Sequence, residues 1–289
     1  MNLINPKLPR RSLLAMLPAL LGACSAVDVL NATVPTDTYL RTEGLAYGAQ
    51  ARQRMDIYQP KVPVRNAPLV VFFYGGSWSS GERADYRFVG EALASQGIVT
   101  LVADYRLSPE FRYPVFLQDS AKAVRWAFDH AQEYGADPAR ILVMGHSAGG
   151  YNAAMMALDK RWLQAEGLMP ARLAGWIGLA GPYDFLPIGD RLTQVAFDWP
   201  NTPEDSQPLS HASSASPPAL LLAPVKDSAV NPQRSTVAMA QRLKASGVRV
   251  ESELFDTVSH VTLVASMASV LRSRAPVLKR VTAFVRSTG

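Results

Sequence analysis

The most informative stretch of the chain reads Ile141-Leu142-Val143-Met144-Gly145-His146-Ser147-Ala148-Gly149-Gly150. Its first four residues form an apolar run typical of a buried strand, and residues 151–158, rich in Ala and Met, favour a helix. Between them lies the pattern Gly-x-Ser-x-Gly. In the order strand, sharp turn, helix, this pattern holds the serine in a strained backbone conformation and exposes its hydroxyl. The stretch therefore predicts an exposed Ser147 at the end of a strand.

Two glycines and a helix end give this turn its chemistry. A Cβ at Gly145 or Gly149 would collide with the neighbouring strand or helix, so glycine is required at both positions. The turn also places Ser147 at a helix N-terminus, where free N–H groups and the helix dipole favour negative charge. The backbone N–H of Ala148 would then face an oxyanion developing on a substrate. The alternative is a chance turn of small residues without chemical function.

Strand-like and helix-like segments alternate along the chain. Apolar runs without alternation indicate strands buried on both faces, and their alternation with helices implies right-handed crossovers. We therefore expect an α/β fold, with a mostly parallel central sheet and helices on both faces. Residues 184–217 lack periodicity and are expected to form a short loop lid. The predicted strands are 44–47, 55–58, 68–74, 98–103, 141–144, 176–179, 219–223 and 248–255, and the predicted helices are 83–96, 117–134, 151–158, 230–245, 261–271 and 277–286.

Ser147 needs partners, because a serine hydroxyl is a weak nucleophile until a base removes its proton and an acid orients that base. In a parallel sheet such groups gather at the C-terminal ends of strands. Asp227 and His260 each follow a predicted strand, and the chain order is serine, acid, histidine. Asp256 and Glu253 compete for the role of the acid. Asp227 is preferred for its strand end, although it could instead cap the following helix.

The other three histidines are weaker candidates for the base. His130 lies in a charged helix end and is expected to face solvent. His146 occupies the second position of the turn and is expected to pack beneath it. His211 falls in the segment 184–217 and could line the site. Only His260 combines a strand end with the required chain order, and a capping or surface role is its alternative.

A second turn, Gly75-Gly76-Ser77-Trp78, follows the predicted strand 68–74. Acyl transfer passes through an oxyanion that must meet fixed hydrogen-bond donors, and glycines let the backbone approach a substrate without a Cβ in the way. The N–H groups around Gly75, Gly76 and Ser77, together with that of Ala148, are therefore the predicted oxyanion hole. A plain strand-exit turn is the alternative.

Composition excludes other classes of function. The chain has 289 residues, 48% of them hydrophobic, and a formal net charge of +5. A single α/β domain of roughly 250 residues is normal. The segment before Cys24 contains Lys7, Arg10 and Arg11 and no acid, so it carries three of these five charges. The remaining chain is close to neutral, and its charge does not indicate a nucleic-acid partner. The single cysteine excludes an internal disulfide and a thiolate metal cluster.

The N-terminus is typical of an exported protein. Residues 1–11 are basic, and residues 12–21 form an apolar stretch too short to span a bilayer. Leu21-Gly22-Ala23-Cys24 resembles the bacterial lipobox, in which the cysteine is lipidated. We expect a lipoprotein signal peptide (1–23), a tether (24–40) and a catalytic domain (41–289). Ser25 after the cysteine implies a periplasmic location on the outer membrane. An ordinary signal peptide and a twin-arginine route through Arg10-Arg11 are alternatives.

Several motifs resemble the α/β-hydrolase superfamily. The stretch 74–78 is similar to its His-Gly-Gly-x-Trp motif, 104–110 to its Asp-Tyr-Arg-Leu-x-Pro-Glu motif, and 145–150 to its serine turn; Asp119 and residues 123–126 also fit. The similarity covers about residues 50–285 and is nearest to the esterases around hormone-sensitive lipase, feruloyl-esterase-like carboxylesterases and kynurenine formamidase. It implies an α/β-hydrolase fold but does not specify a substrate.

Three departures from these families affect the site. Tyr74 replaces the histidine that usually precedes the glycines, so the bonds that brace this loop must differ. Pro224-Val225-Lys226 replaces the usual glycine-containing approach to the acid. Little chain lies between Cys24 and the first strand, so the large N-terminal cap of the hormone-sensitive-lipase type is not expected. We instead expect an open site that the segment 184–217 partly covers.

The resemblance and the ordered residues imply a serine hydrolase that cleaves small carboxylic esters through an acyl-enzyme. Ser147 would attack, His260 would transfer the proton and Asp227 would orient His260. No metal or cofactor is implied. The expected partners are a small ester substrate and a membrane contacted only through a lipid at Cys24, and no oligomeric state is implied. An arylformamidase-type amidase and a non-catalytic binding lipoprotein are the alternatives.

Overall fold

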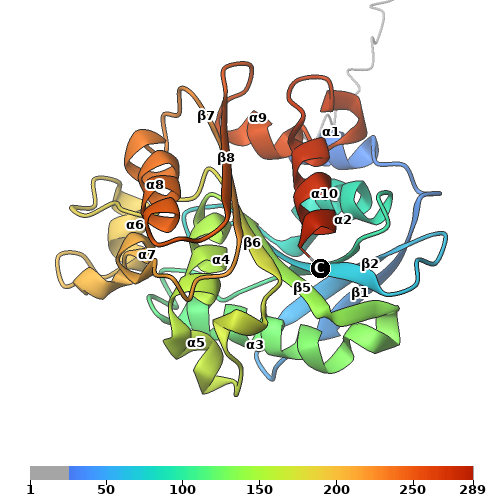
Figure 1. Cartoon of the computed structure of the whole chain (residues 1–289), viewed down its shortest axis with the longest axis horizontal. Helices are drawn as coiled ribbons and strands as arrows, with labels where there is room; N and C mark the ends of the chain where they lie inside the picture. Colours follow the sequence, from blue (N-terminus) through green and yellow to red (C-terminus); the bar gives the residue numbers. More distant parts are fainter. Residues whose placement is uncertain (1–25, 289) are drawn as a thin grey trace, which may run out of the picture.

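The computed structural model describes residues 26–288, and their centre is a single eight-stranded sheet. The strand order is β1-β2-β4-β3-β5-β6-β7-β8 (Figure 1). The β1–β2 and β2–β4 pairs are antiparallel and the remaining pairs are parallel. The predicted mostly parallel α/β fold is confirmed. The strands are β1 (Tyr39–Ala46), β2 (Arg54–Pro60), β3 (Ala67–Phe73), β4 (Val99–Ala103), β5 (Ala136–His146), β6 (Gly175–Leu179), β7 (Ala219–Pro224) and β8 (Val250–Phe255).

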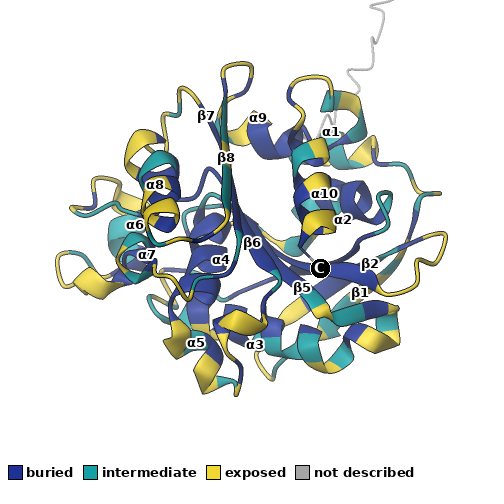
Figure 2. Ribbon diagram, in the orientation of Figure 1, coloured by how far each residue is buried: buried dark blue, intermediate teal, exposed yellow. Residues whose placement is uncertain are grey.

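Helices cover both faces of this sheet. On one face, α2 packs on β2 and β4 and α10 packs on β7 and α2; on the other, α3 and α4 pack on β3 and β5 (Figure 1). Every residue of β3, β4, β6 and β7 is buried, and Figure 2 shows these strands enclosed between helices with exposed outer faces. The longer helices are α2 (Arg87–Ala94), α3 (Val115–His130), α4 (Ala148–Leu158), α8 (Ala238–Ala245) and α10 (Val277–Ser287), and the shorter ones are α5 (Lys160–Ala165) and α9 (His260–Ala265).

The segment after β6 contains more helix than its sequence predicted. The expected irregular loop 184–217 includes α6 (Arg191–Ala196) and α7 (Pro208–His211). Asp190 caps α6, since its carboxylate accepts hydrogen bonds from the backbone N–H groups of Leu192 and Thr193. Helices of six and four residues are too short to produce a recognisable 3.6-residue period. The prediction of a segment without secondary structure was therefore wrong here.

The N-terminal part of the described chain contacts the sheet domain. Helix α1 (Ala26–Ala32) lies against the single turn 83–86 and α2. The side-chain amide of Asn31 donates to the backbone oxygens of Ala84, at 2.9 Å, and Asp85, at 3.1 Å. Val34 is buried in the core. Residues 26–40, which we expected to form a tether, thus include a docked helix and the beginning of β1.

The predicted signal peptide and lipidation site precede the part of the chain that the structure describes. The expected signal peptide, residues 1–23, and Cys24 lie outside the described residues. Within residues 26–288, none of the helices combines the length and the apolar character needed to cross a bilayer.

Candidate active site

Ser147 lies in a strained turn between β5 and α4. Its backbone has φ 54° and ψ −122°, a conformation that non-glycine residues rarely adopt. A Cβ on Gly145 would overlap the carbonyl of Gly149, and a Cβ on Gly149 would overlap the carbonyl of Phe73 in β3. Both glycines are therefore required for the close packing of turn, helix and strand, as the sequence predicted.

The three residues predicted from chain order lie in one hydrogen-bonded series. Ser147 Oγ is 2.8 Å from His260 Nε2, and His260 Nδ1 is 2.7 Å from Asp227 Oδ2. Asp227 follows β7, and His260 follows β8, which is the parallel neighbour of β7. Adjacent parallel strands end at the same edge, so loops far apart in the sequence meet there. Nδ1 of His260 donates to the carboxylate, which leaves Nε2 able to accept the serine proton.

The carboxylate of Asp227 is held on both of its oxygens. Oδ1 accepts hydrogen bonds from the backbone N–H groups of Ala229, at 2.8 Å, and Val230, at 3.0 Å. Burial opposes ionisation, but the hydrogen bonds from His260, Val230 and Ala229 outweigh it and lower the pKa of Asp227 below its ordinary value. The side chain is 1% exposed. Asp227 is therefore the partner of His260, and its other oxygen holds the turn at residues 229–230. It does not cap the following helix, because the helical segment begins only at Gln233.

The competing candidates have other partners or lie at the surface. Glu253 pairs with Arg280 at 2.8 Å, and Asp256 is exposed. His130 pairs with Glu133 near the surface. Nε2 of His211 is 2.7 Å from the backbone oxygen of Asp205. Of the histidines weighed from sequence, His260 is therefore the one that contacts Ser147 through its ring.

His146 has a contact that sequence analysis did not find. It is buried, as expected, but its Nε2 lies 2.9 Å from the backbone oxygen of His260. A carbonyl only accepts, so Nε2 carries the proton. Nδ1 of His146 has no hydrogen-bond partner among residues 26–288, and the rings of His146 and His260 are 4.9 Å apart. Burial, followed by repulsion from His260, lowers the pKa of His146 to about 3.

The glycine loop after β3 lies directly beside the serine. A Cβ on Gly75 would come within 3.0 Å of Ser147 Cβ. Gly76 and Ser77 have positive φ values of 121° and 49°, which turn the chain sharply at this point. Ser77 and Ala148 border the same cavity as Ser147. Ala148 is the first residue of α4, so its N–H has no partner within the helix.

Tyr74 braces this loop where the related families have histidine. Its hydroxyl donates to Asp104 Oδ1 at 3.0 Å and accepts from Arg52 Nη2 at 2.7 Å. Its ring stacks on those of Tyr105, at 4.7 Å, and Tyr86, at 5.6 Å. Burial is the main reason that the pKa of Tyr74 is raised well above its ordinary value. The bracing bonds therefore differ from a histidine's, as the substitution implied.

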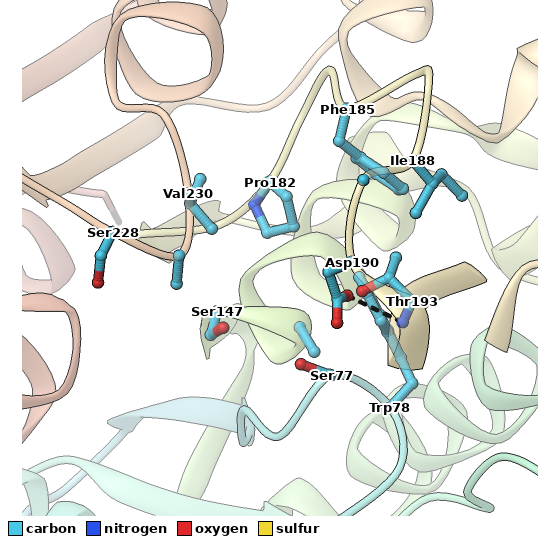
Figure 3. A pocket seen from close by; sticks show the side chains of 13 residues that line it. Ser77, Trp78, Ser147, Pro182, Phe185, Ile188, Asp190, Thr193, Ser228 and Val230 are labelled. Carbon is cyan, nitrogen blue, oxygen red and sulfur yellow. Dashed lines mark hydrogen bonds between the residues drawn. The ribbon is translucent and has the colours of Figure 1, made fainter. Parts of the chain in front are cut away.

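A first cavity of about 340 Å³ opens on one side of Ser147 (Figure 3). Trp78 forms part of its lining, and the Trp78 indole donates to Asn152 at 3.0 Å. Phe185 and Ile188, from the segment expected to cover the site, line the end away from Ser147. We call this the Phe185 cavity. The expected cover is thus supplied by the first part of the segment 184–217.

A second cavity of about 300 Å³ borders Ser147 together with His260 and His146. Val27 and Leu30 of α1 line it, as does Val261 of α9. We call this the α1 cavity. No sequence motif indicates this cavity, because α1 lies more than a hundred residues before the serine. Among the described residues, no group of three or more His, Cys, Asp or Glu is arranged to hold a metal ion.

Comparison with known proteins identifies the family. Residues 55–243, more than half of the chain, match the family model BD-FAE. A probable isoprenylcysteine alpha-carbonyl methylesterase of Arabidopsis thaliana is 26% identical over 250 residues, covering 78% of this chain and 52% of that protein. Esterase LipC of Mycobacterium tuberculosis is 29% identical over 226 residues, covering 72% of this chain and 56% of that protein.

Solved structures share the fold. A truncated carbohydrate esterase from gut microbiota superposes with a TM-score of 0.75 at 18% identity, covering 88% of this chain and 98% of that chain. Identity this low establishes the fold and nothing more. The chain spans about half the length of the two curated relatives. On the family model and the shared architecture, the chain belongs to the BD-FAE family and has the α/β-hydrolase fold.

Proposed function

We propose that this protein hydrolyses carboxylic esters through a covalent acyl-enzyme on Ser147. The observation that carries the proposal is the hydrogen-bonded series from Ser147 Oγ to His260 Nε2, 2.8 Å, and from His260 Nδ1 to Asp227 Oδ2, 2.7 Å. These are the distances at which a base can take a serine proton while an acid holds its tautomer. The series borders two cavities that could hold the two halves of an ester.

Acylation begins when Ser147 Oγ attacks the ester carbonyl carbon and its proton passes to His260 Nε2. The carbonyl oxygen becomes an oxyanion, which the backbone N–H groups of Gly76, Ser77 and Ala148 would stabilise. One such donor is typically worth about 3 kcal/mol in the transition state. The tetrahedral intermediate then expels the alcohol oxygen, which takes the proton from His260. The products of this half-reaction are the free alcohol and an ester on Ser147.

Deacylation repeats these steps with water as the nucleophile. His260 takes a proton from water, the hydroxide attacks the acyl carbon, and the proton returns to Ser147 Oγ as the acid leaves. Asp227 remains ionised throughout, since its hydrogen bonds lower its pKa. Its charge stabilises the imidazolium form of His260 in both half-reactions.

Ester hydrolysis, rather than amide hydrolysis or binding without catalysis, is favoured by two observations. The two relatives compared above are named as esterases. The site also keeps a nucleophile, a base and an acid at hydrogen-bond distance, which a binding protein would not require.

The test is steady-state hydrolysis of p-nitrophenyl butyrate by the purified full chain. The kcat of Ser147→Ala and of His260→Ala should each be at least about a thousandfold below that of the wild type, as is found when the nucleophile or the base is removed from other serine hydrolases. Ser95→Ala, at the end of α2, is the matched serine control and should keep wild-type activity. Wild-type turnover no faster than that of the two site variants would overturn the proposal.

We also propose that the protein is exported and lipidated at Cys24 and acts on the periplasmic side of the outer membrane. The basis is the basic and apolar N-terminal sequence ending in Leu21-Gly22-Ala23-Cys24. In cells fed radiolabelled palmitate, the wild-type chain should incorporate label and Cys24→Ala should not. Equal labelling of both would contradict lipidation at this residue, and recovery of unlabelled wild type from the cytoplasm would contradict export.

A further inference from the structure

Ser147 borders two cavities, and the catalytic histidine lines one of them. Ser147 and Ser77 border both the Phe185 cavity and the α1 cavity. The two cavities differ in their contact with the catalytic base: His260 lines the α1 cavity but does not line the Phe185 cavity. An ester bound at Ser147 therefore has two unequal places for its two halves.

The chemistry of acylation determines which half goes where. When the bond between the acyl carbon and the alcohol oxygen breaks, that oxygen takes a proton from His260 Nε2. The alcohol oxygen must then be within hydrogen-bond reach of His260, and its carbon chain must continue into the space that His260 lines. We propose, on the basis of the function proposed above, that the alcohol half of the substrate binds in the α1 cavity and the acyl half in the Phe185 cavity.

Helix α1 forms part of the wall of the alcohol site. Val27 and Leu30 are three residues apart and so share a helix face, which borders the cavity. Leu30 also packs against the hydrophobic core. The hydrogen bonds from Asn31 to Ala84 and Asp85 hold the helix in place, at 2.9 and 3.1 Å. Two side chains from a segment far from the motifs of the family are therefore specificity-determining residues.

The lining indicates the class of alcohol. Most of the other side chains in the lining are apolar: the rings of Tyr86 and Phe88 and the aliphatic Val261 and Val264. The charged side chain of Asp85 also lines the cavity, and its carboxylate accepts a hydrogen bond from the backbone N–H of Glu82. An apolar group is favoured in such a site because it leaves water without needing hydrogen-bond partners. The cavity volume of about 300 Å³ admits a chain longer than methyl. We therefore assign an apolar alkyl or aryl alcohol to this site, rather than a sugar or a charged alcohol.

The test uses the full chain and two substrate series. One series keeps the acetyl group and lengthens the alcohol from methyl to butyl and hexyl; the other keeps p-nitrophenol and lengthens the acyl group. For the wild type, kcat/KM should rise with alcohol length by up to about fourfold per methylene, the value of burying one CH₂. Leu30→Trp, which fills the cavity, should lower kcat/KM for hexyl acetate at least tenfold and for methyl acetate less than twofold.

Two further variants separate this role from damage to the helix. Val29→Trp places the same ring on the exposed side of α1, where Val29 is 57% exposed, and should keep the wild-type alcohol profile. Leu30→Ala should flatten the dependence on alcohol length. Because the acyl-enzyme has already released its alcohol, its breakdown rate after the initial burst should be equal in wild type and Leu30→Trp.

Three results would overturn the assignment while leaving ester hydrolysis intact. These are an unchanged alcohol profile in Leu30→Trp, an equal change in Val29→Trp, and a change in acyl-length preference in place of alcohol-length preference. Failure of the proposed function gives a different pattern, since wild type and all α1 variants would then hydrolyse none of the esters.

Discussion

Replacement of His146 by glutamine should change how the stability of the protein depends on pH. His146 is 4% exposed, and its Nε2–H donates to the backbone oxygen of His260 at 2.9 Å. A glutamine amide can supply a similar N–H donor but does not titrate. His146→Gln therefore removes the proton-binding site and retains a donor for the buried carbonyl, so it isolates the effect of titration.

The magnitude follows from the pKa of His146, which burial and repulsion from His260 lower to about 3. The unfolded value is about 6.5. Between these values the unfolded chain binds more protons than the folded one, so stability falls as the pH falls below about 6.5. From pH 7.5 to pH 5.0 this single group should reduce the free energy of unfolding by about 2 kcal/mol. The reduction is absent in His146→Gln.

The assay is urea unfolding at pH 7.5 and pH 5.0, followed by intrinsic fluorescence. Wild type should lose about 2 kcal/mol more than His146→Gln between the two pH values. His130→Gln, which removes a histidine near the surface beside Glu133, is the control for the loss of an imidazole in general. Equal losses in wild type and His146→Gln would contradict this prediction, because they would mean that His146 titrates alike in the folded and unfolded states.

Three other predictions concern the site and its supports. Asp227→Asn should lower kcat/KM by about 10³–10⁴-fold without unfolding the chain, because it removes the charge that stabilises protonated His260; activity within tenfold of wild type would contradict this role. Gly149→Ala should cost at least about 3 kcal/mol of stability in urea unfolding, because its Cβ meets the Phe73 carbonyl; a loss below 1 kcal/mol would contradict the packing. Tyr74→Phe should cost about 1–3 kcal/mol, because buried Asp104 loses a hydroxyl donor, and an unchanged urea midpoint would show that water replaces it.

Much of the fold was predictable because its strands are buried on both faces. Such strands appear as unbroken apolar runs, as in β3 and β7, and glycines and polar loops mark their ends. Helices of eight or more residues were also found. The structure adds α1, α5, α6 and α7, which are four to seven residues long, because one or two turns cannot show a helical period.

The members of the candidate site were predictable for a topological reason. In a parallel sheet, residues just after neighbouring strands meet at one edge, so Asp227 and His260 could be paired with Ser147 from order alone. Asp256 satisfied a similar sequence criterion, but it is exposed and His260 Nδ1 is bonded to Asp227 instead. The surrounding contacts were not predictable. The bond from His146 to the His260 backbone and the approach of α1 depend on side-chain packing, which no local pattern encodes.

Ester hydrolysis by this protein requires Ser147 to be the nucleophile. The most direct measurement is mass spectrometry of the full chain after reaction with a fluorophosphonate probe, with the modified peptide sequenced. We expect one stoichiometric adduct, on Ser147, that forms rapidly in wild type and at least a hundredfold more slowly in His260→Ala. No adduct on Ser147, or labelling at the same rate without His260, would contradict it.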